Sequence, residues 1–434
     1  MCTLYHWVSS RLPVRVHPGW AWFRPWPDDS RGDFGYGGAL FLVEYNGLTD
    51  PFADIRPYRD EEVAAVLARL LDDAGFLDAL ASLRLGRVAS LAPGLLRPLV
   101  RWLLTWQVRG VSDVRGMQDI IKRYMDRMIE SATGGFTVSG LEHLDPARAH
   151  LFMSNHRDIA MDPAFTNYAL NRNDFETVRI AIGDNLLTQA WVSDLMRLNK
   201  SFIVKRSVSG PRELLAASKN LANYIQYSIQ QENAPVWIAQ REGRAKDGID
   251  RTEPAVIKML SLSRDKRKQE FAEHIQGLRI VPVAISYELD PCDALKAHEM
   301  FEVASAGSYE KGEQEDVASI GQGIAGEKGR VHVSFGKPLG AGLETPEAVA
   351  AAVDRQIVAE YCLHPTNLFA YRSLHGDDAP IPDNLYLEEG DCSQAEFEAR
   401  IAALPEAHRP YALAIYANAV VSKLALADGA LAPC

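Results

Sequence analysis

Short apolar runs alternate with segments of helical spacing from residue 136 onward. Seven runs have the length of strands: 136–138, 150–153, 178–182, 202–205, 236–239, 280–287 and 331–335. Five segments have the apolar spacing of helices: 163–170, 186–198, 211–230, 266–276 and 346–362. This alternation predicts an α/β fold with a mixed, largely parallel sheet flanked by helices. The charged, glycine-containing stretch 289–330 is predicted to be an insertion or a long loop before the last strand.

The segments on either side of this pattern differ from it in composition. Residues 1–60 are rich in Trp, Pro and Gly, which predicts irregular structure pinned by aromatic side chains. Asp60 is expected to cap an amphipathic helix. Acidic residues accumulate late in the chain, as on a solvated surface, before helical spacing returns. We therefore expect three parts: an N-terminal aromatic-rich and mainly helical region (1–135), the main α/β domain (136–362), and an acidic linker with a C-terminal helical segment (363–434).

Residues 79–112 form a basic stretch inside this otherwise acidic protein. Arginines alternate there with Leu and Trp, and no Asp or Glu interrupts them. Such a stretch is typical of a segment that lies in the interface of an anionic membrane. The alternative is a helix that packs on the main domain, with its arginines in solvent or paired with the acidic C-terminal region. Both interpretations remain open at this point.

Charge, cysteine usage and apolar runs limit the classes of function. The net charge of −11 argues against bulk nucleic-acid binding, which requires a basic surface. The cysteines are odd in number, scattered and without a C-x-x-C pair, so we expect a reducing cytoplasm, no disulfide framework and no zinc site. No signal peptide is visible, and no uninterrupted apolar stretch approaches the ~20 residues of a membrane span. We expect a cytoplasmic protein, soluble or at the inner face of the membrane.

The most informative segment is 155–163, which reads Asn-His-Arg-Asp-Ile-Ala-Met-Asp-Pro. His156 follows an apolar strand, and a carboxylate lies a few residues further on. A His and an orienting carboxylate are the minimum equipment for a general base that deprotonates a hydroxyl. Asp162 is one candidate partner and also suits a helix start, since Pro163 follows it. Asp158 is closer in sequence and competes for the same role.

Two other strands carry notable residues. The strand 202–205 ends in Lys205 and Arg206, which would be delivered to the carboxyl edge of the sheet, where open α/β sheets bind ligands. Both cations could bind a phosphate, although a strand end that is merely exposed to solvent would have the same residues. Pro282 lies inside the apolar run 280–287 and has no N–H for a central ladder position. It predicts a strand entrance, a bulge or the wall of a binding site.

The strand 236–239 runs into a polar loop with glycines and three cations. Gly243 would let the backbone approach a ligand closely. Glu242 could accept a hydrogen bond from a polyol hydroxyl, and Arg244 and Lys246 could hold a phosphate. An ordinary charged turn has the same composition, so the loop alone decides nothing.

In the order in which they occur along the chain, the segments that contain His156, Arg206, Glu242 and Pro282 resemble the glycerolipid acyltransferase superfamily. This superfamily includes glycerol-3-phosphate, dihydroxyacetone-phosphate and lysophosphatidate acyltransferases. The resemblance covers residues 136–340, with a matching Val-x-Val-x-Phe-Gly-x-Pro-Leu at 331–339. It implies that His156 is the general base on the acceptor hydroxyl and that Asp162 orients it. The family spacing is His-x4-Asp, whereas this chain reads His-x5-Asp, so the alignment requires a bulge after His156.

The resemblance also assigns roles to the other three segments. It implies that Arg206 contacts the phosphate, that Glu242 and Gly243 form the acceptor loop, and that Pro282 lies beside the acyl group. Two departures from the family are visible: Gln and Arg stand before Glu242 where many members have Phe-Pro, and Arg244 replaces the usual small residue.

The implied reaction is transfer of a fatty acyl group from acyl-CoA or an acyl carrier protein to a hydroxyl of glycerol 3-phosphate or 1-acylglycerol 3-phosphate. The resemblance implies no metal and no bound cofactor, because the thioester is a substrate. Two alternatives stay open: a catalytically degenerate protein that binds a lipid or membrane surface on the same fold, and a hydrolase of phosphoesters or thioesters that uses the same His. The sequence has no G-x-S-x-G motif, which disfavours the hydrolase.

Overall fold

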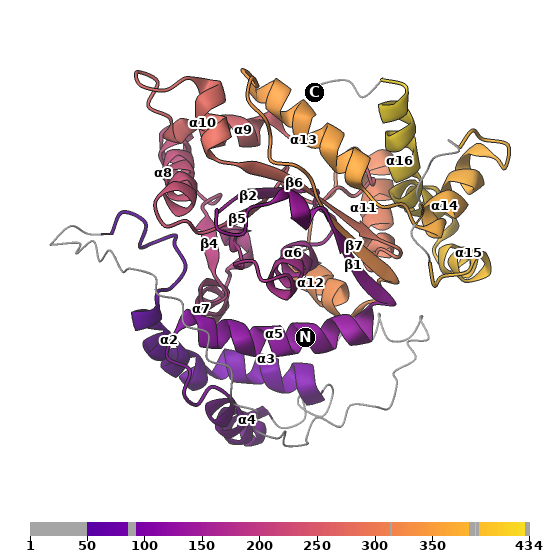
Figure 1. Ribbon diagram of the computed structural model, residues 1–434. Helices are drawn as coiled ribbons and strands as arrows, with labels where there is room; N and C mark the ends of the chain where they lie inside the picture. Colours follow the sequence, from indigo (N-terminus) through magenta and orange to yellow (C-terminus); the bar gives the residue numbers. More distant parts are fainter. Residues whose placement is uncertain (1–49, 86–92, 313–314, 382–386, 388–389, 430–434) are drawn as a thin grey trace. The chain divides into compact units, whose positions relative to one another are not determined.

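Seven strands form one mixed sheet in the computed structural model, which describes residues 50–85, 93–312, 315–381, 387 and 390–429 (Figure 1). The strands are β1 (Gly135–Ser139), β2 (Leu151–Ser154), β3 (Arg179–Gly183), β4 (Ser201–Val204), β5 (Val236–Ala239), β6 (Ile280–Tyr287) and β7 (Arg330–Phe335). Their order is β1-β7-β6-β2-β5-β3-β4, and β6 and β7 are the antiparallel neighbours. The predicted α/β fold with a mixed, largely parallel sheet is confirmed. The irregular structure predicted for residues 1–49 lies outside the described residues.

Helices cover both faces of this sheet. They are α2 (Asp60–Asp72), α3 (Ala74–Leu85), α4 (Pro93–Gln107), α5 (Val114–Ala132), α6 (Met161–Arg172), α7 (Ala190–Leu198), α8 (Pro211–Gln230), α9 (Pro254–Leu260), α10 (Phe271–Gly277), α11 (Asp293–Ala306), α12 (Glu315–Ala325), α13 (Pro346–Glu360), α14 (Pro365–His375), α15 (Gln394–Ala402) and α16 (Arg409–Ala427). All described residues belong to the unit that begins at Asp50.

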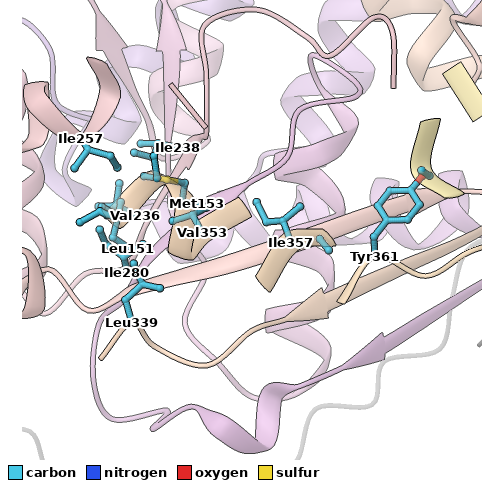
Figure 2. Packing of buried hydrophobic residues seen from close by; sticks show 14 of the residues in the cluster. Leu151, Met153, Val236, Ile238, Ile257, Ile280, Leu339, Val353, Ile357 and Tyr361 are labelled. Carbon is cyan, nitrogen blue, oxygen red and sulfur yellow. The ribbon is translucent and has the colours of Figure 1, made fainter. Parts of the chain in front are cut away.

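Successive side chains along each strand point to opposite faces of the sheet, so they pack in two separate cores. On β2, Leu151 and Met153 join one buried cluster, whereas Phe152 joins the other. The first cluster includes residues of α8, α9 and α13, and Figure 2 shows Ile257 and Val353 packed over the strand residues. The second cluster includes residues of α5 and α6. Each fully buried side chain of this size contributes about 1.5–3 kcal/mol, so the sheet is fixed between two helical layers.

Two expectations about the helices need correction. The segment 289–330 is not a loop, because it contains the helices α11 and α12. Its apolar periodicity is hidden since α11 buries charged residues, among them Asp293 and Lys296. Asp60 is the first helical residue of α2 rather than its N-cap, which is Arg59; the Asp60 carboxylate instead accepts a hydrogen bond from the N–H of Val114, at 2.9 Å.

The basic stretch forms α3 and α4, which pack with α2 in a third apolar cluster. Arg97 pairs with Asp78 and Arg101 with Asp72, so these arginines find partners on the neighbouring helices and not in the acidic C-terminal region.

The C-terminal region is largely helical. Within the described residues, Glu406–Ala427 is the one helix long and apolar enough to cross a membrane. Packing in the protein core also explains its apolar residues, because Ile415, Tyr416 and Val420 are buried in the core cluster that contains residues of α13 and α14.

Candidate active site

The four singled-out segments are anchored in one sheet, and three of them meet at one edge. The strands β2, β5, β3 and β4 are successive parallel neighbours, so their carboxyl ends share an edge. His156 follows β2, Arg206 follows β4 and Glu242 follows β5. This edge is where ligands of open α/β sheets bind.

His156 and Asp162 contact each other directly. The ring Nδ1 lies 2.9 Å from Oδ2 of Asp162. The chain leaves β2, turns through residues 157–160 and starts α6 at Met161, and this turn absorbs the extra residue of the His-x5-Asp spacing. With Nδ1 facing the carboxylate, Nε2 is the free nitrogen, and it has no hydrogen-bond partner among the described residues. We refer to residues 155–162 as the His156 loop.

The carboxylate of Asp162 is completely buried and fully hydrogen-bonded. Its Oδ2 accepts from the N–H groups of Arg157, at 2.7 Å, and Asp158, at 2.9 Å. Its Oδ1 accepts from the hydroxyl of Tyr287, at 2.7 Å. Burial and the Asp162 charge raise the pKa of Tyr287 well above its ordinary value, so the phenol stays a donor. Tyr287 could not be assigned a role from sequence, because its partner is 125 positions away.

Asp158 has a different function in the loop. Its Oδ1 accepts from the N–H groups of Ala160, at 2.9 Å, and Met161, at 2.8 Å, at the start of α6. Burial, followed by the Asp162 charge, raises the pKa of Asp158. Of the two carboxylates that the sequence left open, Asp162 contacts the imidazole and Asp158 shapes the turn.

A second loop, residues 240–250 after β5, is bonded to the His156 loop; we call it the Glu242 loop. The N–H of Ala245 donates to the carbonyl of His156 at 2.7 Å. The buried guanidinium of Arg157 donates to both carboxylate oxygens of Asp250, at 3.1 and 2.7 Å, and to the carbonyl of Gly248, at 3.0 Å. These bonds fix the backbone that carries His156 against the backbone that carries Glu242.

Arg206 and Glu242 form an exposed ion pair, with 3.2 Å between Nη1 and Oε1. Gly243 has a φ of +72°, a conformation that favours glycine, and it turns the chain directly after Glu242. Gly183, at the end of β3, leaves room for Arg206: a Cβ there would lie 3.2 Å from the guanidinium Nε. The structure thus brings the predicted cation and the predicted acidic turn together.

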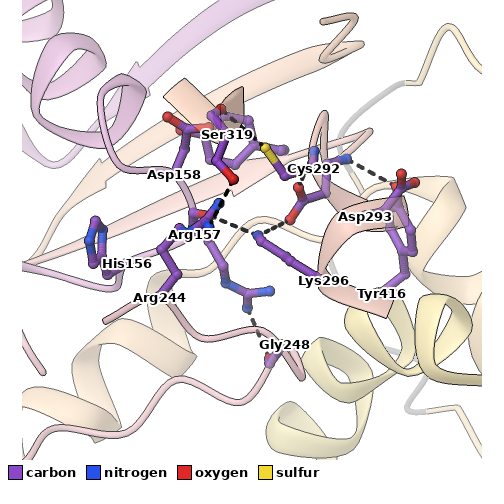
Figure 3. A network of polar contacts seen from close by, with 12 residues as sticks. His156, Arg157, Asp158, Arg244, Gly248, Cys292, Asp293, Lys296, Ser319 and Tyr416 are labelled. Atoms are coloured by element: carbon purple, nitrogen blue, oxygen red, sulfur yellow. Dashed lines mark hydrogen bonds and ion pairs between the residues drawn. The ribbon is translucent and has the colours of Figure 1, made fainter. Parts of the chain in front are cut away.

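Lys205 and Arg244 lie apart from that ion pair. Lys205 pairs with Asp54 and lines a pocket of about 350 Å³ between β4 and α8. Arg244 is buried, and its Nη2 donates to Oγ of Ser319 on α12, at 3.3 Å. Figure 3 shows Arg244 directed toward Ser319 rather than toward His156.

Pro282 is the third residue of the buried strand β6. The carbonyl of Val283 accepts from Asn155 beside β2, so the adjacent Pro282 faces β7, where its carbonyl accepts from Gly336 at 2.8 Å. The ladder with β7 begins only at Val283, so the missing N–H of Pro282 costs no ladder bond.

One further aromatic ring lies near the imidazole. The Trp237 ring on β5 contacts the His156 ring edge to face, with 6.1 Å between centroids.

In the described part of the chain, no group of three or more His, Cys, Asp or Glu residues could hold a metal ion.

Residues 135–286 match the family model described as Acyltransferase, which confirms the resemblance over that segment. No curated protein matches the chain. A solved structure, the 1-acyl-sn-glycerophosphate (LPA) acyltransferase PlsC from Thermotoga maritima, is similar with a TM-score of 0.32 and 13% identity, over 66% of this chain and 96% of that one. A similarity of that size says nothing about the substrates of this chain.

Proposed function

We propose, on the premise that residues 135–286 make this chain a member of the acyltransferase family, that the protein acylates a phosphorylated glycerol. The donor would be acyl-CoA or an acyl carrier protein. The acceptor would be a hydroxyl of glycerol 3-phosphate or 1-acylglycerol 3-phosphate, in a step of phospholipid synthesis. His156 would be the general base and Asp162 its orienting partner.

The observation that carries this proposal is the bond between Nδ1 of His156 and the buried Asp162 carboxylate. Asp162 holds the ring so that Nε2 takes the proton of the acceptor hydroxyl. The alkoxide oxygen attacks the thioester carbonyl carbon, the new C–O bond forms and the C–S bond breaks. The proton then passes from the imidazolium to the leaving thiolate. A base in this position accelerates the reaction by about 10²–10⁴-fold.

Arg206 and Glu242 would hold the acceptor. An exposed ion pair is worth about 0–1 kcal/mol, so a phosphate can take Glu242's place at the guanidinium at little cost. Glu242, once released, can accept a hydrogen bond from a glycerol hydroxyl. Phosphate binding and hydroxyl binding are then coupled through one pair of side chains. Lys205, Gly243, Arg244 and Pro282 remain proposed substrate contacts.

The test is an acceptor panel with one acyl-CoA, with products identified by mass. Glycerol 3-phosphate, dihydroxyacetone phosphate, 1-acylglycerol 3-phosphate and water alone are compared for the parent and for His156→Ala. We expect a phosphorylated glycerol to be acylated by the parent and the rate to fall at least 100-fold in the variant. Near-normal transfer by His156→Ala would exclude His156 as the base, and thioester loss without acylated product would identify a hydrolase.

A second proposal concerns contact with an anionic membrane at the cytoplasmic face. Leu99, Trp102 and Trp106 on α4 follow helical spacing, and they are 52%, 65% and 69% exposed. The helix has no acidic residue, and it carries the exposed Arg101, with the exposed Arg109 just after its end. Exposed Trp side chains in a basic segment suit the interface of an anionic bilayer.

Vesicle sedimentation tests this contact and the non-catalytic alternative together. The parent should sediment with phosphatidylglycerol-containing vesicles, and Trp102→Ser with Trp106→Ser should release it without lowering transfer to a soluble acceptor. Vesicle binding by a parent that acylates no acceptor would instead favour a lipid-surface protein on a degenerate acyltransferase fold.

A further inference from the structure

The backbone of the His156 loop has a second support, from the helix α11. Lys296 of α11 is 1% exposed, and its Nζ donates to the carbonyl of Arg157 at 2.7 Å. Figure 3 shows this side chain reaching from α11 to the residue that follows His156. The same ammonium forms an ion pair with the buried carboxylate of Asp290.

Arg157 is held through all three of its polar parts. Its N–H donates to Asp162, its guanidinium is bound by Asp250, and its carbonyl accepts from Lys296. The two peptide bonds on either side of Arg157 therefore cannot tilt without losing a buried hydrogen bond.

The following helix, α12, also lies against this loop. A Cβ added at Gly323 would come 2.1 Å from Oδ2 of Asp158. Both α11 and α12 lie beyond residue 286, where the match to the Acyltransferase family model ends. The support therefore comes from residues outside the segment that matches the family model.

We propose that Lys296 is a positioning residue for the proposed acyl transfer, and that it acts on His156 through the carbonyl of Arg157. The inference rests on the proposed role of His156. Lys296 touches neither substrate nor the imidazole; it fixes the Arg157–Asp158 peptide, whose N–H donates to the Asp162 carboxylate that contacts the imidazole. Loss of the ammonium frees that carbonyl, and the ring then samples orientations in which Nε2 misses the acceptor hydroxyl.

A matched control exists in a neighbouring ion pair that joins α11 to α15. Asp293 of α11 forms a largely buried ion pair with Arg400 of α15, at 2.7 Å, and Arg400 makes no contact with the His156 loop. Lys296→Met removes the cation that pairs with Asp290, and Arg400→Met removes the cation that pairs with Asp293, so each variant leaves one buried carboxylate without its partner. Both should lower Tm, because an uncompensated buried charge is strongly destabilising. A general loss of stability affects the two variants alike.

The predicted difference between them is kinetic. Lys296→Met should lower kcat for acyl transfer by about 10- to 100-fold, as expected for a displaced catalytic group, and leave the acceptor KM within about twofold. Arg400→Met should keep kcat within about twofold of the parent. Asp290→Asn combined with Lys296→Met removes the unpaired charge, so it should regain Tm while kcat stays low.

Hydrogen exchange gives a readout that does not depend on activity. Exchange of the 155–162 peptide should rise in Lys296→Met and in the double variant, and stay at the parent level in Arg400→Met. Unchanged kcat in Lys296→Met, an equal fall in Arg400→Met, or recovery of kcat in the double variant would overturn the proposal. If the parent itself acylates nothing, the proposed function fails, and unchanged exchange in Lys296→Met then overturns the positioning role separately.

Discussion

The two sides of the candidate site are built in opposite ways. On one side, Asp162 is completely buried and receives four hydrogen bonds, so the imidazole of His156 has one fixed partner. On the other side, Arg206 and Glu242 are exposed and hold each other through one ion pair. The contrast suits the two tasks of the proposed acyl transfer: the proposed base must be oriented before the substrate binds, whereas the proposed phosphate contact must exchange partners.

Asp162→Asn should have the largest effect. An amide keeps the shape but cannot stabilise the imidazolium and can favour the wrong tautomer, so kcat should fall about 10³–10⁴-fold. Steady-state acyl transfer at saturating acceptor measures it. Asp158→Asn is the comparison, since Asp158 contacts the turn and not the ring. A larger loss in Asp158→Asn than in Asp162→Asn would reverse the assignment of the orienting carboxylate.

Arg206→Gln should act on binding instead. Loss of a charge-assisted bond to phosphate should raise the acceptor KM about 10- to 30-fold, with a smaller change in kcat. Because the guanidinium is exposed, the difference in acceptor KM between Arg206→Gln and the parent should shrink in about 0.5 M salt. The fall in kcat of Asp162→Asn should not depend on salt in this way.

Lys205→Gln is the neighbouring comparison. Lys205 pairs with Asp54, so we expect a smaller rise in KM. If Lys205→Gln raised KM more than Arg206→Gln, the phosphate would bind on the α8 side of β4.

The strands and helices could be predicted from the sequence wherever buried side chains recur at a regular spacing or form a continuous apolar run. All seven strands were predicted, because each is an apolar run such as 236–239 bounded by polar residues. The helices α11 and α12 were missed for the opposite reason, because α11 buries Lys296 and Asp293 in ion pairs.

The site was readable in part. Residue types and strand ends pointed to His156, Arg206 and Glu242. The choice between Asp158 and Asp162 depends on the path of a turn, and the roles of Tyr287 and Lys296 depend on contacts across more than 100 positions. No spacing along the chain encodes such contacts.

Tyr287→Phe tests whether the buried side is as ordered as its hydrogen bonds indicate. The variant removes one neutral donor from Asp162 and leaves three, so kcat should fall about tenfold. Because Phe fills nearly the same volume, Tm should change little; a large fall in Tm with an unchanged kcat would make Tyr287 purely structural.

Asp354→Asn should give the smallest effect, on stability alone. Asp354 accepts from the N–H and hydroxyl of Thr252, at 2.7 and 2.6 Å, just after the Glu242 loop. Burial raises its pKa from 3.8 to about 6. The folded state therefore binds the proton more tightly than the unfolded chain, and stability falls as the pH rises from about 4 to 6.

Above that window the charged carboxylate costs about 2–3 kcal/mol, and an amide still accepts both bonds from Thr252. Urea unfolding should show Asp354→Asn more stable than the parent by about 1–3 kcal/mol near pH 7.5 and nearly equal to it near pH 4. Equal stability at both pH values would mean that this carboxylate is not strained by its burial.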